Sequence, residues 1–180
     1  MEPNEVHEFT EQVKEGGEQK MRSVSLIISV LAVLVAIVTV MGHRTHTEAV
    51  LEQARASDIW NEYQAKKIRQ GQISVASDML SLQPNANQAA VEKKLGDYRA
   101  HIQKWTDDLN ENQTRAREFE AKVEEAEKKA SRYDLGEALL QIAVVLSSIT
   151  LLTRQRFYVG FGLVLGIAGL VIAASASFVH

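Results

Sequence analysis

The residues best suited to chemistry begin with two histidines at the end of an apolar segment. His43 and His46 are three positions apart, so a helix would place both imidazoles on one side, where they could share a metal ion. Glu48 is the one nearby candidate for a further ligand, and two ligands make a poor site. We therefore predict no metal site and interpret both histidines as polar residues at a membrane surface.

A second candidate group is Glu137 with Gln141, one helical turn apart at the start of another apolar segment. An ionisable residue inside a membrane is a functional candidate by default. The polar stripe continues along the same predicted helix with Ser147, Ser148, Thr150 and Thr153. In an oligomer this stripe could line a pore, and Glu137 and Gln141 are the candidate pore-lining residues. The alternative is that these groups bond backbone carbonyls or neighbouring helices.

Enzyme motifs are absent from the sequence. It contains no phosphate-binding G-x-x-x-x-G-K-[ST] loop, no H-E-x-x-H and no nucleophile elbow. Gly160 and Gly162 are followed by Leu165 where a dinucleotide-binding fingerprint needs a third glycine. The lack of cysteine excludes thiol catalysis and Cys-based zinc sites, and a net charge of -3 argues against a strongly basic nucleic-acid binder. We predict no catalytic residue, no cofactor and no nucleic-acid partner.

Charge is distributed very unevenly along the 180 residues, which include 20 Lys and Arg and 23 Asp and Glu. Three stretches of 20, 16 and 23 residues carry no charge at all. About 20 apolar residues at a rise of about 1.5 Å match a hydrocarbon core of about 30 Å. The sequence therefore predicts three transmembrane helices, at residues 21–43, 135–153 and 157–179.

The last two predicted spans form a tight helical hairpin, because only Arg154, Gln155 and Arg156 separate them. Small residues recur on one face of the third span at spacings of four, three and four, namely Gly162, Gly166, Gly169 and Ala173. Lipid gives helices no hydrophobic reason to associate, so close approach over small residues is the usual alternative. We interpret this face as a packing surface, either against the second span or against a neighbouring subunit.

Residues 44–134 predict a long helical hairpin with its turn at 83–86, because Pro84 disfavours helix at the preceding residue. The second arm has an apolar seam in steps of four and three, typical of coiled coils. We expect this seam to mediate oligomerisation through Leu95, Tyr98, Ile102, Trp105, Leu109, Asn112, Phe119 and Val123. Asn112 is its one strongly polar member and would fix register. The first arm is weaker, since Lys66 and Gln70 interrupt its rhythm.

Both arms connect to predicted spans, so we expect a stalk that stands off the membrane with its tip near Pro84. Positive charges in the short segments include Lys20, Arg22, Arg154 and Arg156, which favours a cytoplasmic N-terminus and a stalk outside the cytoplasm. Residues 1–20 are polar and acidic, and they predict either a short helix that ends at Gly16-Gly17 or a disordered tail.

Two stretches resemble a known family. They are Ala56–Ile68 (ASDIWNEYQAKKI) and Tyr133–Ile149 (YDLGEALLQIAVVLSSI). With one apolar helix before them and a hairpin after, their order and spacing resemble the bacterial membrane family filed as domain of unknown function 4337. The resemblance implies a bacterial integral membrane protein and carries no assigned chemistry.

These observations predict an all-α integral membrane protein with three transmembrane helices and a long extramembrane helical hairpin forming a coiled-coil stalk. The expected function is that of a non-enzymatic, homo-oligomeric scaffold in a bacterial inner membrane. Its expected partners are further copies of itself, the lipid bilayer and other proteins at the stalk tip. The alternative is a small oligomeric channel or transporter subunit that uses the polar stripe of the second span.

Overall fold

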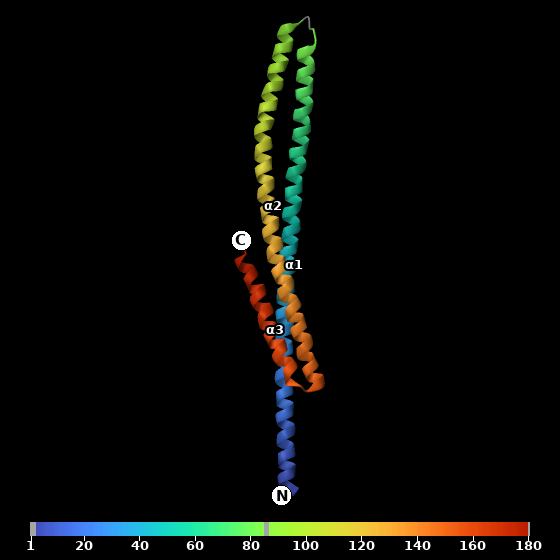
Figure 1. Cartoon of the computed structure of the whole chain (residues 1–180), viewed down its shortest axis with the longest axis vertical. Coiled ribbons are helices and arrows are strands. Elements are labelled where there is room, and N and C mark those ends of the chain that lie inside the picture. The colour runs from blue at the N-terminus through green and yellow to red at the C-terminus, as the bar shows by residue number, and fades with distance from the viewer. Residues whose placement is uncertain (1–2, 85–86, 180) are drawn as a thin grey trace. The chain divides into compact units, whose positions relative to one another are not determined.

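The computed structural model describes residues 3–84 and 87–179, and of residues 3–20 the backbone alone. These residues form helices and contain no strand, which confirms the predicted all-α class. The described residues contain three long helices and one short 3₁₀ helix: α1 (Pro3–Leu82), α2 (Gln88–Thr153), α3 (Arg156–Ser175) and η1 (Ala176–Phe178). The three long helices are labelled in Figure 1.

The break between α1 and α2 falls at the sequence that predicts a turn. Helix α1 ends at Leu82, two residues before Pro84, and α2 begins at Gln88. Asn87 caps α2, since its Oδ1 accepts a hydrogen bond from the Ala90 backbone N–H at 3.1 Å. Asn85, a second asparagine of a type suited to cap this helix, lies outside the described residues.

Helix α1 continues through Gly16-Gly17, so the prediction that these glycines end a short helix is wrong. Each glycine costs about 1 kcal/mol in a helix, but extending an existing helix avoids the larger cost of nucleating a new one. The expected borders at residues 43–44 and 134–135 likewise coincide with no helix end, because α1 and α2 continue through them.

The chain divides into two compact units. The first, called here the three-helix unit, comprises Met1–Thr47 and Glu125–His180. The second, the two-helix unit, comprises Glu48–Glu124. Helices α1 and α2 contribute to both, whereas α3 belongs to the three-helix unit alone.

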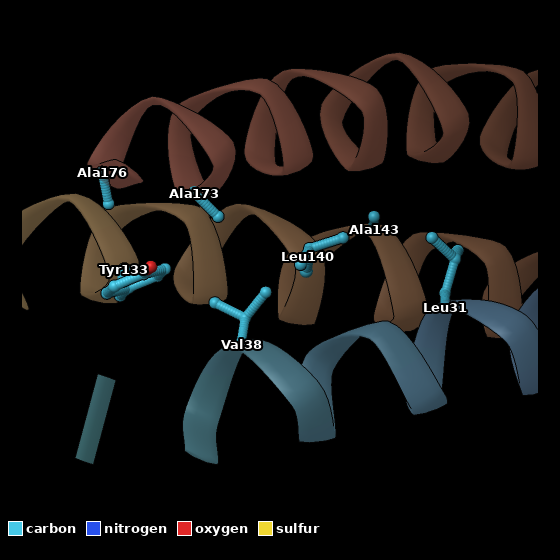
Figure 2. Close-up of a cluster of buried hydrophobic side chains, with 7 residues drawn as sticks. All are labelled: Leu31, Val38, Tyr133, Leu140, Ala143, Ala173 and Ala176. Atoms are coloured by element: carbon cyan, nitrogen blue, oxygen red, sulfur yellow. The ribbon is translucent and has the colours of Figure 1, made fainter. Parts of the chain in front are cut away.

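The core of the three-helix unit draws side chains from all of its helices. Figure 2 shows this cluster, which consists of Leu31, Val38, Tyr133, Leu140, Ala143, Ala173 and Ala176. Many large apolar residues of this unit face outward instead, among them Leu26, Val33 and Phe157. Three helices of the described chain are long and apolar enough to cross a membrane.

The connection between α2 and α3 is the predicted tight turn. Helix α2 ends at Thr153 and α3 begins at Arg156, so two residues reverse the chain. Arg154 adopts a left-handed conformation with φ of 55°, and its N–H donates to the Thr150 carbonyl at 2.9 Å. A left-handed residue after a helix is the usual way to satisfy its last carbonyls.

The two-helix unit is an antiparallel pair formed by residues 48–82 of α1 and 88–124 of α2. Contacts between the two helices run in opposite order along them. Trp60 Nε1 donates to Glu120 Oε1 at 2.8 Å, and Gln70 Nε2 donates to Thr106 Oγ1 at 2.7 Å. As residue numbers rise in α1 they fall in α2, as expected for a helical hairpin.

Candidate interaction surfaces

The small-residue face of α3 lies against α2 within the same chain. A Cβ atom added at Gly162 would lie 2.8 Å from Ser147 Oγ and 2.9 Å from the Ala143 carbonyl oxygen. One added at Gly169 would lie 2.7 Å from the carbonyl oxygen of Gly136. These separations are far shorter than a carbon atom tolerates, so the backbones approach as closely as they do because side chains are missing.

Gly166 lies where all three helices meet. A Cβ atom there would be 3.0 Å from Leu31 Cδ2 of α1 and 3.5 Å from Ala143 Cβ of α2. Gly162, Gly166, Gly169 and Ala173 are all buried. The sequence allowed this face to pack either against the second span or against a neighbouring subunit. In the structure it packs within one chain, against α2 and α1.

Sequence reasoning overlooked the residues of α2 that receive this face. Gly136 is the main one, because a Cβ there would lie 2.8 Å from both Ala173 Cβ and the Gly169 carbonyl oxygen. Gly136, Ala143 and Ser147 are buried and spaced by seven and four, which places them on one side of α2. That spacing of small residues is the feature of the sequence from which this side of α2 could have been predicted as a packing surface.

The polar stripe of α2 is divided between two faces. Ser147 and Thr150 are buried, and their hydroxyls have no hydrogen-bond partner within the described chain. Ser148 and Thr153 are exposed, and each donates to the carbonyl four residues earlier, at 2.8 and 2.9 Å. This bonding to backbone carbonyls is the alternative that the sequence left open for the hydroxyl groups.

Glu137 and Gln141 lie on the outward side of α2 and bind each other. Gln141 Nε2 donates to Glu137 Oε1 at 2.8 Å. Gln141 is exposed and Glu137 is partly exposed, so neither points into the core of the three-helix unit.

The two histidines near residue 43 differ in their surroundings. His46 Nε2 lies 3.0 Å from Asp134 Oδ2 and 3.2 Å from Oδ1, which connects α1 to α2. His43 is exposed. In the part of the chain that the structure describes, no group of three or more His, Cys, Asp or Glu residues is placed to hold a metal ion.

The predicted seam of α2 is covered unevenly in the two-helix unit. Leu109, Asn112 and Val123 are buried. The remaining seam residues are only partly buried, namely Leu95, Tyr98, Ile102, Trp105 and Phe119. No described residue between Ile59 and Leu109 is buried. The seam therefore packs against α1 within the hairpin. The packing is tight only where α1 up to Ile59 meets α2 from Leu109 onward.

Polar side chains replace apolar ones along the inner face of α1. Lys66 Nζ lies 2.8 Å from Glu62 Oε1 and 3.6 Å from Asp108 Oδ2. The hydrogen bond between Lys66 and Glu62 lowers the pKa of Glu62 and raises the pKa of Lys66. Asn112, which also lowers the Glu62 pKa, is buried, and its Nδ2 has no partner of hydrogen-bond geometry among the described residues. The hairpin thus contains a polar layer where α1 and α2 meet.

The opposite side of α1 carries a second apolar stripe that the sequence analysis did not recognise. Its members, called here the outer stripe, are Ala65, Ile68, Gln72, Val75, Met79 and Leu82. They recur in steps of three and four. Each lies two positions after one of the partly buried residues on the inner face of α1, which places the stripe about 200° around the helix from that face. The inner residues are Tyr63, Lys66, Gln70, Ile73, Ser77 and Leu80. Ile68, Val75, Met79 and Leu82 are 62, 58, 62 and 83% exposed.

The architecture defines a class of protein: an all-α chain with three helices able to cross a membrane, two of which extend into a separate helical hairpin. The family model described as "Domain of unknown function (DUF4337)" matches residues 20–179, and the chain belongs to that family. No curated protein and no solved structure matches the chain.

Proposed function

We propose that this protein is a non-enzymatic membrane scaffold that assembles with copies of itself. The three apolar segments anchor it in a bacterial inner membrane, and the two-helix unit supplies the surface for association outside the lipid. Support for the anchor comes from three helices of sufficient length and apolar character. The large apolar side chains on the outside of the three-helix unit suit contact with lipid.

The outer stripe of α1 is the observation that carries the proposed assembly. Single exposed apolar residues are ordinary, but four large ones in register along one helix form a patch of the kind that marks an interaction site. Their three-and-four spacing suits a helical partner, because knobs-into-holes packing requires that rhythm. The hairpin's own seam cannot use this surface, since it lies on the opposite side of α1.

The occupant that we propose is the outer stripe of a second copy. Copies inserted in one membrane in the same way run parallel, so identical residues of the stripe meet at the same level. Gln72 would then face Gln72 of the second copy. An amide both donates and accepts, so two of them can bond each other and fix the register, as a polar residue in a coiled-coil seam does.

The test compares Val75→Asp with Ser74→Asp. Both positions are exposed, and they are adjacent in the same helix. The two variants therefore introduce the same charge and differ only in whether it lies on the outer stripe. Each variant is extracted in detergent, and the protein mass of the complex is measured by light scattering. We expect more than one chain for wild type and Ser74→Asp, and fewer chains per complex for Val75→Asp.

Carbonate washing of the membranes tests the anchor separately, and an inserted protein stays in the pellet. A single chain for the wild type, or an unchanged mass for Val75→Asp, contradicts self-assembly through the outer stripe. Release of the protein into the carbonate supernatant contradicts the anchor. Circular dichroism shows whether the variants retain wild-type helicity.

A further inference from the structure

A polar patch lies on the outward side of α2 in the three-helix unit. Gln141 is exposed and donates to Glu137 Oε1 at 2.8 Å. Ser148 follows two turns after Gln141 on the same side, also exposed, with its hydroxyl bonded to the Val144 carbonyl. The neighbouring outward residues are apolar, among them Val145 at 60% exposure. Glu137, Gln141 and Ser148 together are called here the polar edge.

The polar edge is ill suited to lipid. If residues 135–153 span a membrane, as in the proposed function, Glu137 and Gln141 face the surroundings rather than the buried side of α2. A polar group in hydrocarbon is costly unless its hydrogen bonds are made. The bond between these two side chains satisfies only part of their capacity. Glu137 retains its second carboxylate oxygen, and Gln141 retains one N–H and its carbonyl oxygen.

The donors and acceptors that remain free on Glu137 and Gln141 are complementary to those of the same two residues on another chain. The second N–H of each Gln141 can donate to Glu137 of the other copy, and each carboxylate then accepts one bond from each chain. Two copies related by a two-fold axis provide both bonds at once, because such an interface uses the same patch twice. A partner without an amide or hydroxyl group at this level could not make them.

We propose that the polar edge is the contact through which a second copy of this chain binds within the membrane. Glu137 and Gln141 form the reciprocal hydrogen bonds, and Ser148 lies beside the contact. This inference rests on the membrane insertion in the proposed function. It adds an intramembrane interface that is independent of the outer stripe on the two-helix unit.

Single cysteines test the contact, because the natural sequence contains none. Ser148→Cys places a thiol at the polar edge. The matched control is Ile142→Cys, which is also outward-facing at 48% exposure but lies about 100° around the helix from Gln141. Each variant is oxidised in native membrane vesicles, and the fraction of disulfide-linked dimer is measured. We expect a dimer for Ser148→Cys and at least about fivefold less for Ile142→Cys.

Removing the amide should then weaken the contact. Gln141→Leu in the Ser148→Cys background should lower the dimer fraction at least about fivefold, since it removes both reciprocal hydrogen bonds and each interhelical hydrogen bond in a membrane contributes on the order of 1 kcal/mol. Val145→Leu in the same background is the control, because it enlarges an outward apolar residue and removes no polar group. Equal cross-linking at positions 142 and 148, or no effect of Gln141→Leu, overturns the inference.

The two proposals fail in different ways. If Ser148→Cys does not cross-link while the wild type remains oligomeric and Val75→Asp dissociates it, the polar edge is wrong and the outer stripe stands. If the thiol of the Ser148→Cys variant reacts with a membrane-impermeant maleimide on intact vesicles of either orientation, position 148 lies in water and the polar edge is wrong, while the carbonate wash decides whether the protein is inserted. Cross-linking of Ser148→Cys that is lost with Gln141→Leu and unaffected by Val75→Asp supports the polar edge alone.

Discussion

The three-helix unit and the two-helix unit share α1 and α2 but hold their helices together differently. In the three-helix unit, backbones touch through glycine and alanine, as at Gly162 and Gly169. In the two-helix unit, long side chains and polar pairs fill the space between helices, as with Trp60 on Glu120 and Gln70 on Thr106. Helices α1 and α2 therefore each change their mode of packing between the two units.

The difference is the one expected if the three-helix unit lies in lipid, as proposed above, and the two-helix unit lies in water. In water, burying apolar side chains is favourable in itself, so a seam of large residues is sufficient to pair two helices. In lipid that driving force is missing, and helices associate through close contact over small residues. The glycines differ between the units in the same sense, apart from Gly160 of the three-helix unit, which has open space beside it. Gly136, Gly162, Gly166 and Gly169 have neighbours within van der Waals distance of an added Cβ, whereas Gly71 and Gly96 of the two-helix unit have none within 4 Å.

The largest expected effect comes from adding a side chain to the crowded face of α3. Gly169→Leu would place its Cβ 2.7 Å from the Gly136 carbonyl oxygen, so α2 and α3 must separate. Overpacking of this kind costs about 3 kcal/mol. The measurement is the free energy of unfolding in detergent micelles, followed by ellipticity.

Gly160→Leu is the control, because Gly160 has nothing within 4 Å of an added Cβ in the same helix. The only two tryptophans, Trp60 and Trp105, lie in the two-helix unit, so their fluorescence shows whether that unit is affected. Equal losses for Gly169→Leu and Gly160→Leu would contradict the close approach of α2 and α3.

The second prediction concerns the buried amide in the seam of the two-helix unit. Asn112 is 4% exposed, and its Nδ2 makes no hydrogen bond within the described chain. Asn112→Leu removes a buried amide whose Nδ2 makes no hydrogen bond of good geometry, at the cost of its interaction with the Glu62 carboxylate, and should raise the free energy of unfolding by about 1 kcal/mol. Urea unfolding followed by tryptophan fluorescence measures it. Asn110→Leu, at an exposed position of the same helix, should change little. A loss of stability in Asn112→Leu would show that the amide is satisfied in solution.

The third prediction sharpens the contrast between the glycines by making one substitution in both units. Gly96→Ala in the two-helix unit should stabilise by about 1 kcal/mol, because alanine favours helix and its Cβ meets nothing. Gly136→Ala in the three-helix unit should destabilise, since its Cβ would lie 2.8 Å from Ala173 Cβ. Fluorescence follows the first variant and ellipticity the second. Effects of the same sign would show that the two units do not differ in packing.

Much of the architecture could be predicted because its signals are local in sequence. Runs without charge indicated the three apolar helices, and Pro84 indicated the break between α1 and α2. The small face of α3 was visible from spacing alone. Gly16-Gly17 misled because helix propensity was weighed locally, whereas the helix extends from a long neighbouring segment.

The parts that could not be predicted depend on which face of one helix meets another. Gly136 matters only because the register of α2 against α3 brings it to Gly169. The outer stripe is not evident from the sequence, because Lys66 and Gln70 interrupt the inner three-and-four spacing of α1 and so obscure the second spacing two positions later. Glu137 and Gln141 were recognised as polar, but their outward direction required the structure.

The smallest expected effect tests the polar layer of the two-helix unit. Lys66 lowers the pKa of Glu62, so the contribution of Glu62 to stability is complete above its ordinary pKa and is lost as pH falls through the lowered value. The pKa of Lys66 is raised, so the contribution of Lys66 to stability is complete below its ordinary pKa and is lost only as the pH rises to strongly alkaline values. Because the Glu62 side chain is 52% exposed, solvent screening limits the pair to less than about 1 kcal/mol.

Glu62→Gln isolates that contribution. At pH 7 the wild type should be the more stable of the two in urea unfolding followed by tryptophan fluorescence. The difference should shrink as pH falls below the ordinary pKa of glutamate, because protonation of Glu62 removes the charge that pairs with Lys66. It should also shrink in about 1 M salt, which reduces the screening length to about 3 Å. If the difference in free energy of unfolding between wild type and Glu62→Gln does not change as the pH is lowered, Glu62 contributes through packing rather than through its charge. The polar layer would then be held together in the same way as the apolar seam around it.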